Sequence, residues 1–74
     1  MESKPILITS EHCPNCKKAK EYLWENNVKF DIRGARDVMD LVNKFKIDHV
    51  PALIVGEKAY FGLIGIIRYV NLDM

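Results

Sequence analysis

The sequence predicts an α/β domain with a four-stranded mixed sheet, helices on both faces, and the element order β-α-β-α-β-β-α. Short apolar runs typical of strands alternate with segments whose apolar residues recur every three or four positions, as in amphipathic helices. The last two strand-like runs are separated only by a glycine turn, which indicates a hairpin and one antiparallel pair. Two strand-helix-strand crossovers precede it, and we expect these to give parallel pairs.

The first half of the chain supplies two strands and a helix. Residues 5–9, PILIT, form a continuous apolar run, which is typical of a strand buried on both faces. Residues 14–26 carry apolar side chains at spacings of three and four and predict an amphipathic helix, with Pro14 in the first turn, where its missing N–H costs nothing. Residues 28–32, VKFDI, alternate apolar and polar and predict the second strand.

The second half supplies two helices and the hairpin. A helical stripe at i, i+3, i+4 and i+7 predicts the second helix, through Val38, Leu41, Val42 and Phe45. Residues 49–56, HVPALIVG, and 57–61, EKAYF, predict a hairpin that turns near Gly56 and Glu57. The third helix is expected at residues 63–72, with one apolar face made of Leu63, Ile66, Ile67 and Val70.

Composition and charge narrow the class of protein. We expect one domain over residues 1–74, because 49% hydrophobic and 28% charged residues are typical of a globular chain. The net charge of +1, without long runs of one sign, argues against nucleic acid or an anionic membrane as the main partner. No apolar stretch is long enough to span a membrane, and the first residues lack the features of a secretory signal, so we expect a cytoplasmic protein.

The two cysteines of the chain stand in a CPNC motif at the predicted start of the first helix, as Cys13 and Cys16. Disulfides in the cytosol are mostly transient and catalytic, and a bridge across so short a loop would constrain the unfolded chain little. The helix N-terminus favours a thiolate, and the neighbouring His12, Lys17 and Lys18 add positive potential, so we expect a lowered pKa for Cys13. Cys13 would then attack a disulfide and Cys16 would resolve the mixed disulfide.

A metal site is the alternative interpretation of the same thiols. Cys13 and Cys16 with His12 and His49 would make a Cys2His2 zinc set, and an iron–sulfur cluster shared between two chains would also need thiolates. Such a chain would be a non-catalytic metal-binding or delivery module. The spacing matches no zinc finger, so we expect no metal and rank this alternative second.

The CPNC motif, the HVPALIV segment at residues 49–55, the length and the element order together resemble the glutaredoxin family of the thioredoxin fold, over essentially the whole chain. The resemblance implies a thiol–disulfide oxidoreductase that needs no cofactor beyond its own Cys13–Cys16 disulfide. It implies a cis peptide bond before Pro51, facing the cysteines, and a Val50 backbone that pairs with an extended substrate. Pro14 and Asn15 would also line the substrate site.

Two departures separate this chain from the members of that family that use glutathione. Those members resemble one another in a lysine shortly before the first cysteine, where this chain has Ser10 and Glu11. They also carry a glycine pair and an acid after the hairpin, where this chain has FGLIG at residues 61–65. The resemblance therefore points to redoxins that act as small thioredoxins. Such proteins reduce protein disulfides and draw electrons from a thioredoxin-type reductase, with glutathione as the other possible donor.

Apolar residues after the hairpin leave two interpretations open. Phe61, Ile64 and Tyr69 occupy a region in which the family would hold polar ligand contacts. They either enlarge the core of a short chain or form a hydrophobic docking patch for a protein partner on an otherwise monomeric protein.

Overall fold

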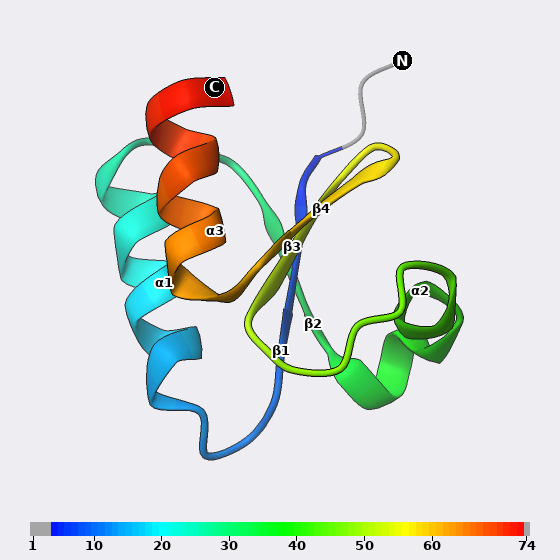
Figure 1. The fold of residues 1–74 in the computed structure, drawn as a ribbon. Coiled ribbons are helices and arrows are strands. Elements are labelled where there is room, and N and C mark those ends of the chain that lie inside the picture. Colours follow the sequence, from blue (N-terminus) through cyan, green and yellow to red (C-terminus); the bar gives the residue numbers. More distant parts are fainter. Residues whose placement is uncertain (1–3, 74) are drawn as a thin grey trace.

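The computed structural model describes residues 4–73. Within this range the chain forms four strands and three α-helices in the predicted order (Figure 1). Two further helical turns, η1 and η2, extend this pattern, η1 being a 3-10 turn before α2 and η2 a π-helical turn after α3. The elements in chain order are β1 (Ile6–Thr9), α1 (Pro14–Glu25), β2 (Asp31–Gly34), η1 (Ala35–Val38), α2 (Met39–Lys44), β3 (Ala52–Val55), β4 (Lys58–Phe61), α3 (Gly62–Arg68) and η2 (Tyr69–Asp73).

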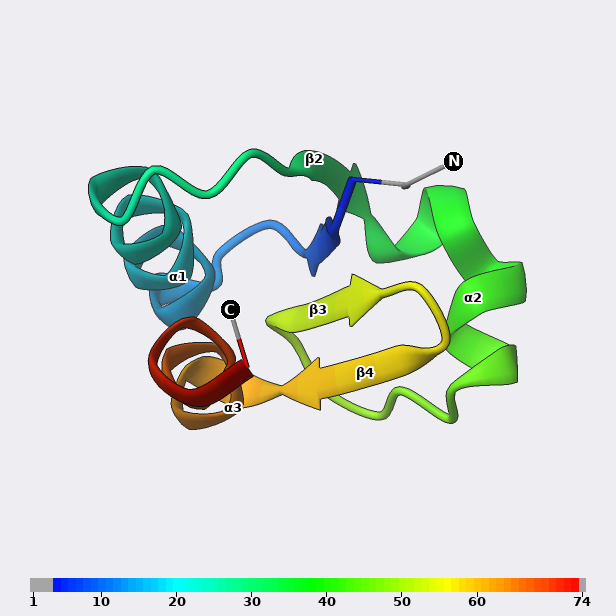
Figure 2. The ribbon, with the colours of Figure 1, turned by 90° about the horizontal axis from the view of Figure 1, so that it is seen from above.

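The four strands make one mixed sheet in the order β2-β1-β3-β4. Helices α1 and α3 cover one face and α2 covers the other (Figure 2). Leu7 and Ile8, adjacent on the central strand β1, are both fully buried but belong to the two cores on opposite faces. Because neighbouring residues of a strand point to opposite faces, this confirms the prediction of a first strand buried on both sides.

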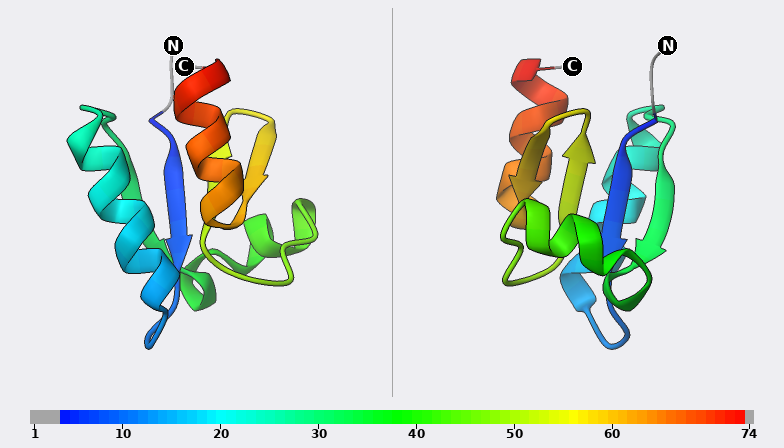
Figure 3. Two further views of the ribbon diagram at one scale, coloured as in Figure 1. Left: turned by 60° about the vertical axis from the view of Figure 1, so that its left-hand side comes forward. Right: turned by 90° about the vertical axis from the view of Figure 1, so that its right-hand side faces the viewer.

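The second crossover does not give the parallel pair that we expected. β1 and β2 are parallel, but β3 runs antiparallel to β1 and to β4. Helix α2 has six residues, about 9 Å of helical rise, and it lies across the sheet (Figure 3). The chain therefore enters β3 at the end of the sheet where β1 and β2 finish. This reversal brings residues 50 and 51 to the start of α1.

The second strand lies further along the chain than predicted, at Asp31–Gly34 rather than at residues 28–32. Asn27, with a φ of 60°, ends α1 in a Schellman motif in which the Val28 N–H donates to the Leu23 carbonyl oxygen at 2.9 Å. Val28 thus belongs to the end of the helix, and its side chain is buried in the same core as Leu23. The apolar position that we assigned to a strand is the hydrophobic contact of this cap.

The predicted face of the third helix is largely correct. Ile66 is fully buried, and Leu63 and Val70 pack against the same core. Tyr69 is half-buried and packs against that core, with its ring 5.0 Å from the ring of Tyr60, so the core interpretation fits this residue. Tyr69 is three residues beyond Ile66, so it lies on the same side of the helix, where the end of α3 runs alongside α1 (Figure 1).

No helix within residues 4–73 is both long enough and apolar enough to cross a lipid bilayer.

Candidate active site

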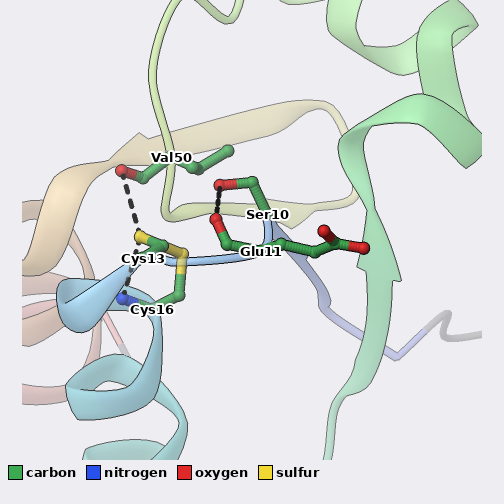
Figure 4. Close-up of a disulfide and its surroundings, with 5 residues drawn as sticks. All are labelled: Ser10, Glu11, Cys13, Cys16 and Val50. Carbon is green, nitrogen blue, oxygen red and sulfur yellow. Dashed lines mark hydrogen bonds between the residues drawn. A yellow bond between two sulfur atoms is a disulfide. The ribbon is translucent and has the colours of Figure 1, made fainter.

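The two cysteines lie where the carboxyl end of β1, the start of α1 and the start of β3 meet. Cys13 and Cys16 are joined by a disulfide, with their Cα atoms 5.2 Å apart, and Val50 faces Cys13 across this junction (Figure 4). The structure thus brings Val50, from a distant segment of the sequence, beside the neighbouring cysteines Cys13 and Cys16.

Cys13 is the N-cap residue of α1. Its backbone is extended, with φ −113° and ψ 100°, and Pro14 follows as the first helical residue. The Cys13 sulfur accepts a hydrogen bond from the Cys16 backbone N–H at 3.2 Å, in the position that a serine or threonine oxygen takes in an ordinary cap. A donor from the helix end therefore points at the sulfur that we expect to react.

The two sulfurs differ in accessibility. Cys13 is half-buried, whereas Cys16 is only 2% exposed. A substrate sulfur can approach Cys13 from solvent but cannot approach Cys16 without opening the helix end. The burial of the second cysteine leaves Cys13 as the one accessible thiol of the pair.

The Val50–Pro51 peptide bond is cis, as the resemblance implied. The Val50 carbonyl oxygen lies 3.9 Å from the Cys13 sulfur, a separation at which a Cys13 thiol would donate a weak S–H···O hydrogen bond. Pro51 is buried, and its carbonyl oxygen accepts the Gly62 N–H at 2.8 Å. The backbone beside the cysteines is therefore tied to the start of α3.

The other predicted site residues stay on the surface around this junction. Pro14, Asn15, Lys17, Lys18 and His12 are all exposed. Among the described residues none of these side chains forms a hydrogen bond or ion pair with either sulfur. Their roles in binding substrate or in stabilising a thiolate remain predictions.

The four side chains of the zinc alternative do not assemble. His49 is exposed, and its Nδ1 lies 2.6 Å from Asp48 Oδ1. Within residues 4–73 no three histidine, cysteine, aspartate or glutamate side chains gather closely enough to hold a metal ion. The set of Cys13, Cys16, His12 and His49 is therefore not formed in this conformation.

Sequence reasoning missed a pocket on the β2 side of the cysteines. This cavity of about 480 Å³ is lined by residues 9–12 of the loop before α1 and by residues 34–37 at the end of β2. The sequence did hold a signal for it, because ligand sites in α/β proteins often lie beyond the carboxyl ends of parallel strands. Because the second strand was predicted at residues 28–32 and not at Asp31–Gly34, residues 34–37 were not recognised as lying at a strand end.

A family model described as glutaredoxin matches residues 6–60. No curated protein sequence shows significant similarity to the chain. Solved structures do match over nearly its full length.

Three of these structures illustrate the fold. The glutaredoxin-like protein NrdH-redoxin from Escherichia coli superposes with a TM-score of 0.74 and 15% identity, covering 93% of this chain and 92% of the other. The thioredoxin-like protein BC3987 gives 0.70 and 22%, covering 90% and 99%. Glutaredoxin from Brucella melitensis gives 0.71 and 19%, covering 95% and 80%. At these identities the likeness establishes a thioredoxin-like fold.

Proposed function

The chain belongs to the glutaredoxin family, and from this premise we propose that it is a thiol–disulfide oxidoreductase that reduces disulfides in other proteins. The observation that carries the proposal is the unequal cysteine pair at the start of α1: an accessible, helix-capping Cys13 within disulfide distance of a buried Cys16. A structural disulfide would have no need of this accessibility or of a donor aimed at the exposed sulfur.

The reaction follows from this arrangement. The Cys13 thiolate attacks one sulfur of the substrate disulfide, the substrate S–S bond breaks, and the departing thiolate takes up a proton. The Cys16 thiolate then attacks the Cys13 sulfur of the mixed disulfide and releases the second substrate thiolate, which is also protonated. Two electrons and two protons pass from the protein dithiol to the substrate, and the resulting Cys13–Cys16 disulfide is then reduced to the dithiol by a reductase.

Val50 and Pro51 are the groups that we propose hold the substrate chain. Val50 immediately precedes the buried proline at the head of β3, and its carbonyl oxygen already contacts Cys13. A substrate segment that pairs with this backbone as an added strand would place its own cysteine beside Cys13. Backbone pairing of this kind is tolerant of substrate sequence.

We favour use as a small thioredoxin, with a thioredoxin-type reductase as donor, over strict dependence on glutathione. Ser10 and Glu11 stand where the glutathione-using members would have a lysine, and Glu11 is exposed at the site. The Escherichia coli redoxin of the same fold has been described as having a thioredoxin-like activity profile. We propose a thioredoxin-like use for this chain as well.

Two single substitutions test the assignment. Cys13→Ser should abolish reduction of a protein disulfide, whereas Cys16→Ser should allow the first attack and accumulate a covalent mixed disulfide on Cys13, detected by intact mass after acid quenching. Retention of turnover by Cys13→Ser would overturn the proposal. A mixed disulfide that accumulated on Cys16 in Cys13→Ser at a comparable rate would reverse the roles of the two cysteines.

A further inference from the structure

The pocket beside Cys13 lies where this fold can accept a ligand. Thr9 and Gly34 are paired at the carboxyl ends of the parallel strands β1 and β2, and both line the pocket. The chain leaves β1 for α1 on one face of the sheet and leaves β2 for η1 and α2 on the other (Figure 2). A crevice forms at such a switch point, and it is the usual ligand position in open α/β sheets.

The pocket also adjoins the redox site along the chain. Its wall includes His12, which directly precedes Cys13, and Glu11 and Ser10 before it. The volume of about 480 Å³ exceeds what one side chain needs and falls in the range of ligand pockets. A substrate chain that presents a cysteine to Cys13 would therefore have a neighbouring side chain within reach of this cavity.

The charged groups of the lining have no ionic partners among residues 4–73, where the single ion pair joins His49 and Asp48. The Glu11 side chain extends away from the disulfide toward β2 (Figure 4). The Asp37 carboxylate lies over Gly34, another residue of the lining: its Oδ2 is 3.4 Å from the position that a Cβ would take on Gly34. Arg36 supplies the one guanidinium, so two carboxylates and one cation give the lining a net charge of −1 with His12 neutral.

We propose that this pocket is a specificity subsite for a basic side chain, a lysine or arginine of the substrate protein close to its reactive disulfide. The inference rests on the proposed function and names the class of substrate that it prefers. A substrate ammonium or guanidinium between Glu11 and Asp37 would gain two unlike charges, whereas an acidic side chain would meet both carboxylates and could gain only Arg36. Glu11 also stands beside Ser10, where a glutathione-binding site would need a cation, so the same charge disfavours a carboxylate ligand.

The test compares three peptides that each contain one intramolecular disulfide, with lysine, alanine or glutamate at the positions flanking the cysteines. Pre-reduced protein is mixed with each peptide at low ionic strength, and the second-order rate of peptide reduction is measured after acid quenching. The variants are Glu11→Gln and Asp37→Asn, with Glu57→Gln as the matched control. Glu57 is an exposed glutamate in the turn between β3 and β4, at the far end of the sheet (Figure 1).

The lysine peptide should react roughly two- to tenfold faster than the alanine peptide, as expected for one or two solvent-exposed charge pairs. Glu11→Gln and Asp37→Asn should each reduce this ratio, Glu57→Gln should leave it unchanged, and high salt should remove it. The alanine peptide serves as the reference in every variant, so a change in the intrinsic reactivity of Cys13 cancels from the ratio.

Equal rates for the three peptides would overturn the inference and leave the proposed function standing. A faster glutamate peptide whose advantage disappears in Arg36→Gln would also overturn it, because the pocket would then select an acid. Failure to reduce any of the three peptides, the alanine peptide included, would count against the proposed function itself and against the inference that rests on it.

Discussion

The sulfur of Cys13 accepts the backbone N–H of Cys16 at 3.2 Å, so the atom that caps α1 is also the atom that we expect to react. A sulfur at the N-cap accepts a backbone hydrogen bond and lies at the positive end of the helix dipole. Both effects favour the thiolate without any charged side chain in contact. The Val50 carbonyl oxygen, 3.9 Å away on the other side, is an acceptor and favours the protonated thiol instead. The helix end has the shorter contact and several free N–H groups, so its effect should be the larger one.

The first prediction is that the pKa of Cys13 in the reduced protein lies below the ordinary range of a free cysteine. The rate of Cys13 alkylation by iodoacetamide as a function of pH, measured in Cys16→Ser, gives this pKa directly. The neutral double variant Lys17→Gln/Lys18→Gln should raise the pKa only slightly, and less at high salt, because both ammonium groups are exposed. A large rise would show that the lysines, and not the helix end, dominate.

The same shift predicts how the stability of reduced Cys16→Ser depends on pH. Because we expect the pKa of Cys13 to be lower in the folded chain than in the unfolded chain, the unfolded chain should bind more protons between these two values. The contribution of Cys13 to the free energy of unfolding is therefore fully present above the unfolded-state pKa and is lost as the pH falls through the folded-state pKa. Urea unfolding at several pH values measures it, and Cys13→Ser/Cys16→Ser, which lacks the titrating thiol, should lose this component.

A third prediction concerns glutathione. In glutathione redox buffers the wild-type protein should lose two hydrogens, as two protons and two electrons passed to oxidised glutathione, with a single midpoint, and it should show no persistent glutathione adduct by intact mass. Ser10→Lys supplies the cation that glutathione-using members of the family carry in this region, so this variant should accumulate more adduct during the same titration. A stable adduct of one glutathione on wild-type Cys13 would mean that the site recognises glutathione without that lysine.

Much of the fold could be predicted because local patterns and burial agree. The apolar run that holds Leu7 and Ile8 predicted a strand buried on both faces, and the spacing after Pro14 predicted α1 to within one residue of its observed end. The direction of β3 could not be predicted in this way. It depends on how short α2 is and on where the following loop returns to the sheet, and neither is a property of the hydrophobic pattern.

The candidate site likewise has a part that the sequence could predict and a part that it could not. Cys13 and Cys16 are three residues apart, so helix geometry alone placed their sulfurs together, and the family motif placed Val50 beside them. The pocket of Glu11 and Asp37 required knowledge of which strand ends lie side by side. Because the strand was predicted at residues 28–32 and the helical stripe from Val38 onward, Arg36 and Asp37 lay between the two elements and were not placed at the end of a strand.

A fourth prediction compares two isoleucines of α3. Ile66 is fully buried in the core with Leu7 and Leu53, whereas Ile64 is 73% exposed. Ile66→Ala should lower the free energy of unfolding by about 2–5 kcal/mol, while Ile64→Ala should change it by less than about 0.5 kcal/mol. Urea unfolding of the oxidised protein measures both. If Ile64→Ala leaves stability intact, as expected, and also slows reduction of a protein disulfide, the patch of Phe61 and Ile64 is a docking surface.

The last prediction uses two lysines at the end of α2. Lys46 follows the helix with a φ of 52°, a left-handed conformation that costs a residue with a side chain about 1 kcal/mol and costs glycine little. Lys44 is the final residue of the helix itself. Lys46→Gly should therefore raise the free energy of unfolding by about 0.5–1 kcal/mol, whereas Lys44→Gly should lower it by a similar amount. Both variants remove one positive charge, so electrostatics alone would change their free energies of unfolding in the same direction. A change in the same direction, measured by urea unfolding, would contradict the conformational argument.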